Sequence, residues 1–280
     1  MSKPMRAAAI QMATGPSVDS NLIEVERLIK EAAEMGANLV VLPENFAFMG
    51  NKDQDQLGIA ESPGDGPLQA FLSSTADRLG IWLVGGTIPL RATVPDRVRS
   101  ASLVFDSSGQ QVARYDKMHL FDVSLPGSQE RYHESATLDP GDQLAVVETP
   151  LGRMGVAVCY DLRFPELFRQ MQDHGVELLA IPSAFTALTG KAHWEVLVRA
   201  RAIENLAYVI AAAQGGYHLN GRETHGHSMI VDPWGAILAQ VPRGTGAICC
   251  PLDGGFQQSV RRSFPVLDHR RLKCSLAVDT

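Results

Sequence analysis

The chain has 280 residues, of which 45% are hydrophobic and 20% are charged, a composition typical of a globular protein with a large core. Its formal net charge of −6 argues against the basic surface that a nucleic-acid-binding protein needs. The four cysteines are too few for a disulfide framework, which favours a reducing compartment. The apolar run near the N-terminus ends at Gln11, too early for a signal peptide or a membrane span. We therefore expect a cytoplasmic protein.

Apolar runs that are typical of strands alternate with helical patterns along the chain. The first helix is expected at residues 21–35, where Asp19 or Ser20 caps its start and Gly36 ends it. Two later helices are expected, one beginning near Pro165 and one at residues 194–206. Strands are expected at residues 7–12, 39–42, 81–88, 103–105, 144–148, 155–158, 178–181, 207–213, 229–231, 236–239 and 247–250. This alternation, with no repeat and no clear linker, predicts α/β layering in a single domain over residues 1–280.

The expected strand at residues 155–158 is followed directly by Cys159, and Pro165 stands where the next helix begins. A strand-to-helix turn of this kind holds one side chain at the mouth of a sheet, where backbone N–H groups can face a substrate. A cysteine at that point indicates a nucleophile, although a lone cysteine is by default a small buried hydrophobe. A neighbouring ion pair or dipole would lower the pKa of its thiol below the free value of about 8.5.

Two other motifs supply the groups that a nucleophilic thiol needs. Glu44 follows the expected strand at residues 39–42, and Lys117 follows the one at residues 103–105. A carboxylate can take the thiol proton, and an ammonium can stabilise the oxyanion that forms when a thiolate attacks a carbonyl. Either residue could instead be an ordinary solvated charge, as most Glu and Lys residues are.

Together these motifs resemble the Glu–Lys–Cys signature of the nitrilase superfamily, the carbon–nitrogen hydrolases. They occur in the order of the family, as PEN, YDKMHLF and CYDLRFPE. Blocks similar to the Nit branch of this superfamily lie at residues 190–195, 199–205 and 226–235, and the likeness spans about residues 7–271. The resemblance implies the α/β fold of this superfamily, a four-layer α-β-β-α sandwich.

The resemblance also implies a mechanism without a cofactor. Glu44 is expected to be the general base, Cys159 the nucleophile that forms a thioester, and Lys117 a ligand of the oxyanion. The backbone N–H of Tyr160, directly after the cysteine, is expected to share the oxyanion with Lys117.

Each of three further residues has two interpretations, one as part of the site and one as an ordinary structural residue. Glu134 lies where the family has a second glutamate, and the alternative is an acid of a surface loop. Arg163 could clamp a substrate carboxylate, or it could pair with Glu166 at the start of a helix. His119 follows Lys117 by two residues, and we expect it to be part of the scaffold rather than a catalytic group.

A metal site is not expected. His218, His225 and His227 lie close together, with Cys249 and Cys250 downstream, but these spacings match no zinc pattern. His225 and His227 would share one face of a strand, which needs no metal. A catalytically silent binding or metal-binding protein is the alternative of another class.

The expected activity is that of an amidase that hydrolyses a non-peptide C–N amide bond in a small α-keto-acid amide. The LRFPEL and RARAIEN segments resemble the subgroup of the Nit branch that acts on deaminated glutathione. The alternative is an ω-amidase acting on 2-oxoglutaramate or a related dicarboxylic monoamide. Arg163 would suit the α-keto-acid carboxylate that both substrates carry.

Loops are expected to shape the pocket, at residues 51–66 over the site, 121–133 and 185–191. Residues 215–224 could form a further contact loop or could be solvated. The resemblance implies a homodimer, or a higher homo-oligomer, formed through helices next to the cysteine turn.

Overall fold

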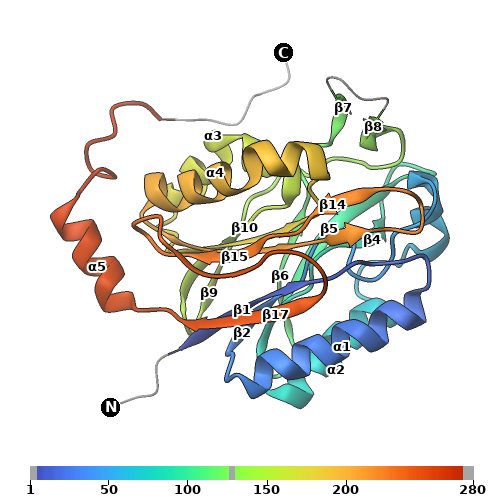
Figure 1. Cartoon of the computed structure of the whole chain (residues 1–280), viewed down its shortest axis with the longest axis horizontal. Coiled ribbons are helices and arrows are strands. Elements are labelled where there is room, and N and C mark those ends of the chain that lie inside the picture. The colour runs from blue at the N-terminus through green and yellow to red at the C-terminus, as the bar shows by residue number, and fades with distance from the viewer. Residues whose placement is uncertain (1–4, 126–129, 274–280) are drawn as a thin grey trace.

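The computed structural model describes residues 5–125 and 130–273. Within them, two large sheets face each other, and helices cover both outer faces (Figure 1). The first sheet has the order β17-β1-β2-β3-β5-β4, with β6 also paired to β5. Its strands are β1 (Arg6–Gln11), β2 (Leu39–Val41), β3 (Trp82–Val84), β4 (Ile88–Arg91), β5 (Val98–Phe105), β6 (Gln111–Asp116) and β17 (Gly246–Pro251).

The second sheet has the order β16-β15-β12-β11-β10-β9. Its strands are β9 (Ala145–Thr149), β10 (Gly152–Val156), β11 (Leu178–Ser183), β12 (Tyr208–Ala213), β15 (Ser228–Val231) and β16 (Ile237–Val241). Two small hairpins lie outside both sheets: β7 (Asp122–Ser124) with β8 (Arg131–His133), and β13 (Gly215–Tyr217) with β14 (Glu223–His225).

Helices α1 (Val18–Glu34) and α2 (Pro67–Leu79) cover the first sheet, while α3 (Pro165–Asp173) and α4 (Ala187–Asn205) cover the second (Figure 1). Helix α5 (Gly254–Ser263) follows β17. Short 3₁₀ turns are η1 (Asp53–Ile59), η2 (Glu134–Ala136) and η3 (Cys159–Arg163). The expected four-layer α-β-β-α sandwich is thus confirmed.

The side chains of the inner strands alternate between two cores. In β1, Ala7 and Ala9 belong to the core between the sheets, whereas Ala8 and Ile10 pack with α1 and α2. Because successive side chains of a strand point to opposite faces, a strand buried on both faces reads as one apolar run. That is why the inner strands were recognisable in the sequence.

The parallel pairings bring the ends of several strands to one edge. β2 runs parallel to β1 and β3, and β11 runs parallel to β10 and β12. Polar residues that follow the carboxyl ends of such strands therefore lie near one another, as is usual for the sites of open α/β sheets.

Some element boundaries differ from those expected. Helix α1 is capped by Ser17, whose hydroxyl accepts a hydrogen bond from the Ser20 N–H, rather than by Asp19 or Ser20. The strand expected at residues 81–88 is two strands, β3 and β4, because Gly86 has a φ of 53° and turns the chain. Helix α4 begins at Ala187, seven residues earlier than expected, because Thr186 caps it and the low helix propensity of Gly190 obscured its first turns.

In the parts of the chain that the structure describes, no helix combines the length and the apolar character that crossing a membrane requires.

Candidate active site

Cys159 is the first residue of η3 and follows β10 after Ala157 and Val158. Its φ of 46° is in the left-handed region, which a residue with a side chain adopts at a cost of about 1–3 kcal/mol. The thiol is almost buried, and its Sγ accepts a hydrogen bond of 3.4 Å from the Ala184 N–H, just beyond β11. The turn therefore presents Cys159 at the carboxyl edge of the second sheet.

Lys117 lies between two carboxylates. Its Nζ is 2.9 Å from Oε1 of Glu44 and 2.8 Å from Oε2 of Glu134, and its side chain is 1% exposed. Glu44 follows β2, Lys117 follows β6 and Glu134 begins η2, so three distant segments meet here. Gln214 fixes the main chain beside this cluster, because its Nε2 donates to the Glu44 carbonyl at 2.9 Å.

The charges of this cluster determine its protonation. Burial opposes the charge of Lys117, but the carboxylates of Glu134 and Glu44 outweigh burial and raise the pKa of Lys117 well above its usual range. Burial also raises the pKa of Glu134, and the charge of Glu44 adds to this effect while Lys117 opposes it. The resting cluster thus holds an ammonium between two acids.

The pKa of the Cys159 thiol is raised, whereas we expected it to be lowered. Burial raises the pKa of Cys159 well above its usual range, and the negative charge of Glu44 raises it further. Lys117 and the Ala184 N–H lower the pKa, but Lys117 already shares its charge with two carboxylates. The expectation of a lowered pKa was wrong, and the raised pKa favours the neutral thiol at rest.

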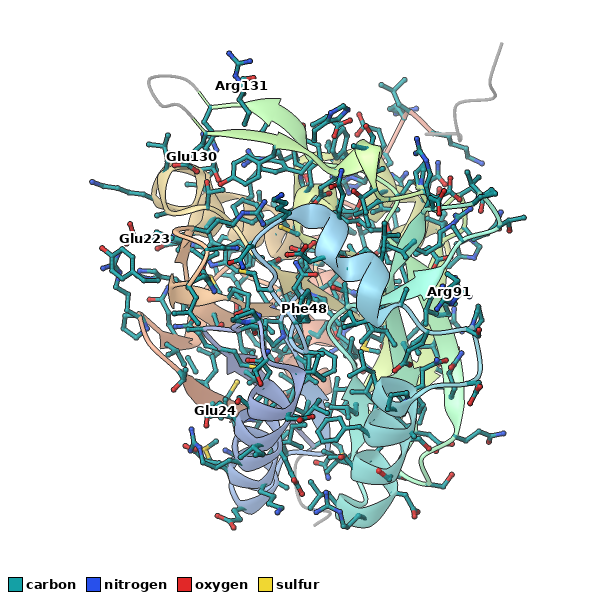
Figure 2. All side chains as sticks on the ribbon, turned by 90° about the vertical axis from the view of Figure 1, so that its right-hand side faces the viewer. Glu24, Phe48, Arg91, Glu130, Arg131 and Glu223 are labelled. Atoms are coloured by element: carbon teal, nitrogen blue, oxygen red, sulfur yellow. The ribbon has the colours of Figure 1, made fainter. Side chains whose placement is uncertain are left out.

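A pocket opens over Cys159. Aromatic side chains form much of its wall, and two arginines and several polar groups complete it. The lining residues are Glu44, Asn45, Met49, Phe121, Tyr132, Glu134, Cys159, Tyr160, Arg163, Ala184, Phe185, Thr186, Thr189, Arg222, Glu223 and Thr224. Glu223, one of these lining residues, lies on the same side of the molecule as Glu130 in the view of Figure 2.

The two arginines of the pocket come from different elements. Arg163 ends η3, its guanidinium lies 5.1 Å from the ring centre of Phe185, and its Nη1 is 3.1 Å from Nδ1 of His193. Arg222 precedes β14 and lies 4.8 Å from the ring centre of Tyr132. Arginine is suited to planar, bidentate recognition of carboxylates, so the pocket offers two cationic contacts to an anionic ligand.

The chain matches the model of the carbon-nitrogen hydrolase family over residues 6–261. It belongs to this family. A relative from Yersinia enterocolitica, named deaminated glutathione amidase, is 42% identical over 275 residues, which cover 98% of this chain and 96% of the relative. The resemblance seen in the sequence is therefore confirmed.

Two solved structures of the family are similar to this one. Nit3 from Saccharomyces cerevisiae, described as a member of branch 10 of the nitrilase superfamily, is 33% identical with a TM-score of 0.86, over 97% of this chain and 98% of that chain. A mutant amidase from Nesterenkonia sp. AN1 is 26% identical with a TM-score of 0.76, over 94% and 98% of the two chains. That structure shows the result of Michael addition of acrylamide at the active-site cysteine.

The structure of this hydrolase brings together the residues singled out in the sequence. Glu44, Lys117, Glu134 and Cys159 form one cluster, and Tyr160 and Arg163 line the pocket beside it. Glu134 is a member of the cluster and not an acid of a surface loop. The guanidinium of Arg163 contacts His193 and Phe185, whereas Glu166 is exposed on α3; the role of Arg163 as a carboxylate clamp stays a prediction.

The predicted loops contribute unequally to the pocket. Residues 121–133 supply Phe121 and Tyr132, with positions 126–129 outside the described residues, and residues 185–191 supply three lining side chains. Residues 51–66 supply none among the described lining residues, so their expected position over the site was wrong; this segment packs against β4 instead. Residues 215–224, for which the sequence left a contact loop or a solvated loop open, supply Arg222, Glu223 and Thr224.

Two histidine predictions have different outcomes. His119 belongs to the scaffold: its ring stacks on Phe164 at 3.7 Å, and its Nδ1 is 2.7 Å from Oδ1 of Asp161. His225 and His227 do not share a strand face, because β14 ends at His225 and the chain turns at Gly226. Their rings stack at 4.3 Å across that turn. Within residues 5–125 and 130–273, no group of three or more His, Cys, Asp or Glu side chains is placed to hold a metal ion.

Proposed function

We propose that this protein is an amidase that hydrolyses deaminated glutathione through a thioester on Cys159. One observation carries the proposal: a strained cysteine turn presents its thiol to a buried cluster of Glu44, Lys117 and Glu134 at the base of a pocket. The name of the Yersinia enterocolitica relative and the cysteine adduct of the Nesterenkonia amidase support it.

In the first half of the reaction, Glu44 accepts the thiol proton as Sγ of Cys159 attacks the amide carbon. This order fits a thiol whose pKa is raised, because such a thiol needs a base at the moment of attack. Lys117 and the backbone N–H of Tyr160 stabilise the oxyanion, a contribution of about 3 kcal/mol for one well-placed donor. The C–N bond then breaks, and Glu44 delivers its proton to the leaving amine.

In the second half, water attacks the thioester carbonyl. A carboxylate of the cluster takes a proton from the water, the C–S bond breaks, and the proton returns to the sulfur as the acid leaves. Glu134 binds Lys117 through both oxygens, at 3.0 and 2.8 Å, and also accepts from the Phe121 N–H at 2.8 Å. We assign to Glu134 the fixing of Lys117 and a share of the charge that activates water.

The pocket favours a substrate with two carboxylates. Deaminated glutathione carries one at its keto-acid end and one at its glycine end, and its scissile amide lies between them. 2-Oxoglutaramate carries only the first. Arg163 and Arg222 lie on different elements that line the pocket, so each can take one carboxylate.

The test compares three substrates with purified wild type and Cys159→Ala. We expect release of cysteinylglycine and 2-oxoglutarate from deaminated glutathione by the wild type, measured by mass spectrometry, and none by the variant. Faster ammonia release from 2-oxoglutaramate would change the assignment to an ω-amidase. Ammonia release from a simple nitrile would change the assignment to a nitrile-hydrolysing enzyme. Turnover of none of the three would refute the substrate assignment.

We propose further that the protein forms a homodimer through the outer face of α4. Val196 and Ile203 of that helix are exposed, as is Trp234 in the turn between β15 and β16. Ile203 lies against Gly235, so these apolar side chains form one patch. The single domain over residues 1–280 and the cytoplasmic location stay predictions.

A further inference from the structure

Asp161 lies behind the nucleophile, outside the pocket, and its carboxylate is fully buried. Its Oδ2 accepts hydrogen bonds from the Val158 N–H at 2.8 Å and from the Tyr115 hydroxyl at 2.7 Å. Its Oδ1 accepts from the His119 N–H at 3.0 Å and lies 2.7 Å from His119 Nδ1. A buried carboxylate is stabilised only when such donors surround it, and here each oxygen has two.

These donors belong to the two segments that must meet for catalysis. Val158 directly precedes Cys159, so one hydrogen bond is made at the entrance of the cysteine turn. Tyr115 and His119 lie two residues before and two residues after Lys117. Because β10 is in the second sheet and β6 is in the first, Asp161 links the two sheets immediately beside the site.

We propose that Asp161 is the positioning residue that sets Sγ of Cys159 relative to Nζ of Lys117. A backbone conformation such as the φ of 46° at Cys159 persists only where its surroundings over-determine it, and the bond to Val158 supplies part of that constraint. On the other side, the bonds to Tyr115 and His119 hold both flanks of Lys117. The stacking of His119 on Phe164, at the end of the same turn, ties the segments a second time.

This role rests on the proposed catalytic roles of Cys159 and Lys117, and a small change can test it. Tyr115→Phe removes one hydroxyl from the Asp161 network and keeps the ring. The matched control is Tyr208→Phe, because Tyr208 is also buried but its hydroxyl bonds to the Asp253 backbone. We expect Tyr115→Phe to lower kcat about tenfold with KM within twofold, and the control to leave both unchanged.

Asp161→Asn is the larger change, because an amide has one acceptor oxygen and must give up one pair of donors. We expect it to lower kcat about a hundredfold, and the double variant with Tyr115→Phe to be no worse, since both remove the same link. If Asp161→Asn does not fold, Tyr115→Phe alone decides the question.

A second readout does not depend on the substrate. The rate at which iodoacetamide alkylates the Cys159 peptide, followed by mass spectrometry, should fall in Tyr115→Phe and not in Tyr208→Phe. If wild type does not turn over deaminated glutathione, the substrate assignment fails, and alkylation still tests Asp161. Alkylation within twofold of wild type in Tyr115→Phe, together with a lowered melting temperature, would show that Asp161 only stabilises the fold.

Discussion

Lys117 shares one positive charge between two acids, at 2.9 Å from Glu44 and 2.8 Å from Glu134. Removing either acid therefore changes the electrostatic environment of the other. Glu134 has a raised pKa, because it is buried and because Glu44 is negative. As the pH falls through that pKa, Glu134 takes up a proton and attracts Lys117 less strongly.

The pH dependence of catalysis follows from this arrangement. We predict that kcat/KM of the wild type declines on the acid side at a pH above 4.5, the ordinary pKa of Glu134. Glu134→Gln should lower kcat about a hundredfold and remove the part of the decline that the raised pKa of Glu134 causes, because glutamine does not titrate. The measurement is kcat/KM between pH 4 and 9.

Glu166→Gln serves as the control for this profile, because Glu166 is exposed on α3 and should leave the acid limb in place. An acid limb that is identical in wild type and Glu134→Gln would contradict the assignment of this titration to the cluster.

The left-handed backbone of Cys159 gives a second prediction at this scale. Cys159→Gly should be more stable than Cys159→Ala by about 1 kcal/mol, because glycine adopts a φ of 46° without steric cost. In a chain of this size the difference amounts to about 2 °C in melting temperature, measured by calorimetry.

Ala157 lies two residues earlier and is not among the described residues with a positive φ. Ala157→Gly should therefore destabilise the protein, because glycine there brings only the entropic cost. Equal melting temperatures for Cys159→Gly and Cys159→Ala would show that the turn stores no strain.

At the scale of elements, the β13–β14 hairpin delivers Arg222 to the pocket. We predict that Arg222→Gln raises KM for deaminated glutathione about tenfold and leaves KM for 2-oxoglutaramate unchanged, because only the former has a second carboxylate. Arg163→Gln should raise KM for both. Steady-state kinetics on the two substrates measure this, and an equal effect of Arg222→Gln on both would assign Arg222 another role.

The elements differ in how much of the site the sequence could predict. Glu44 and Cys159 were recognisable because each follows an apolar run that a doubly buried strand requires. Arg222 was not, because its place in the pocket depends on how the β13–β14 hairpin packs against a distant segment, and local patterns carry no information on that packing. The pKa of Cys159 was mispredicted since burial and the sharing of Lys117 appear only in three dimensions. Asp161 had one signal, an acid two residues after the cysteine.

At the scale of the whole molecule, the apolar patch on α4 predicts a homodimer. Size-exclusion chromatography with light scattering should give twice 30.3 kDa. A charge at Val196, as in Val196→Glu, should produce a monomer, because burying it in an apolar interface is unfavourable. Ile23→Glu, on the exposed face of α1, is the matched control and should stay dimeric. A monomeric wild type would refute the proposal.

The neutral state of the Cys159 thiol also affects how readily the sulfur is oxidised or alkylated between turnovers. Peroxides and electrophiles react with thiolates far faster than with thiols, so we expect a sulfur whose pKa is raised by burial and by Glu44 to react with them more slowly than a thiolate would. We expect the empty protein to survive oxidising conditions that inactivate enzymes with a resting thiolate. In the proposed mechanism, its sulfur becomes a strong nucleophile only when a carbonyl lies beside Lys117 to accept the charge.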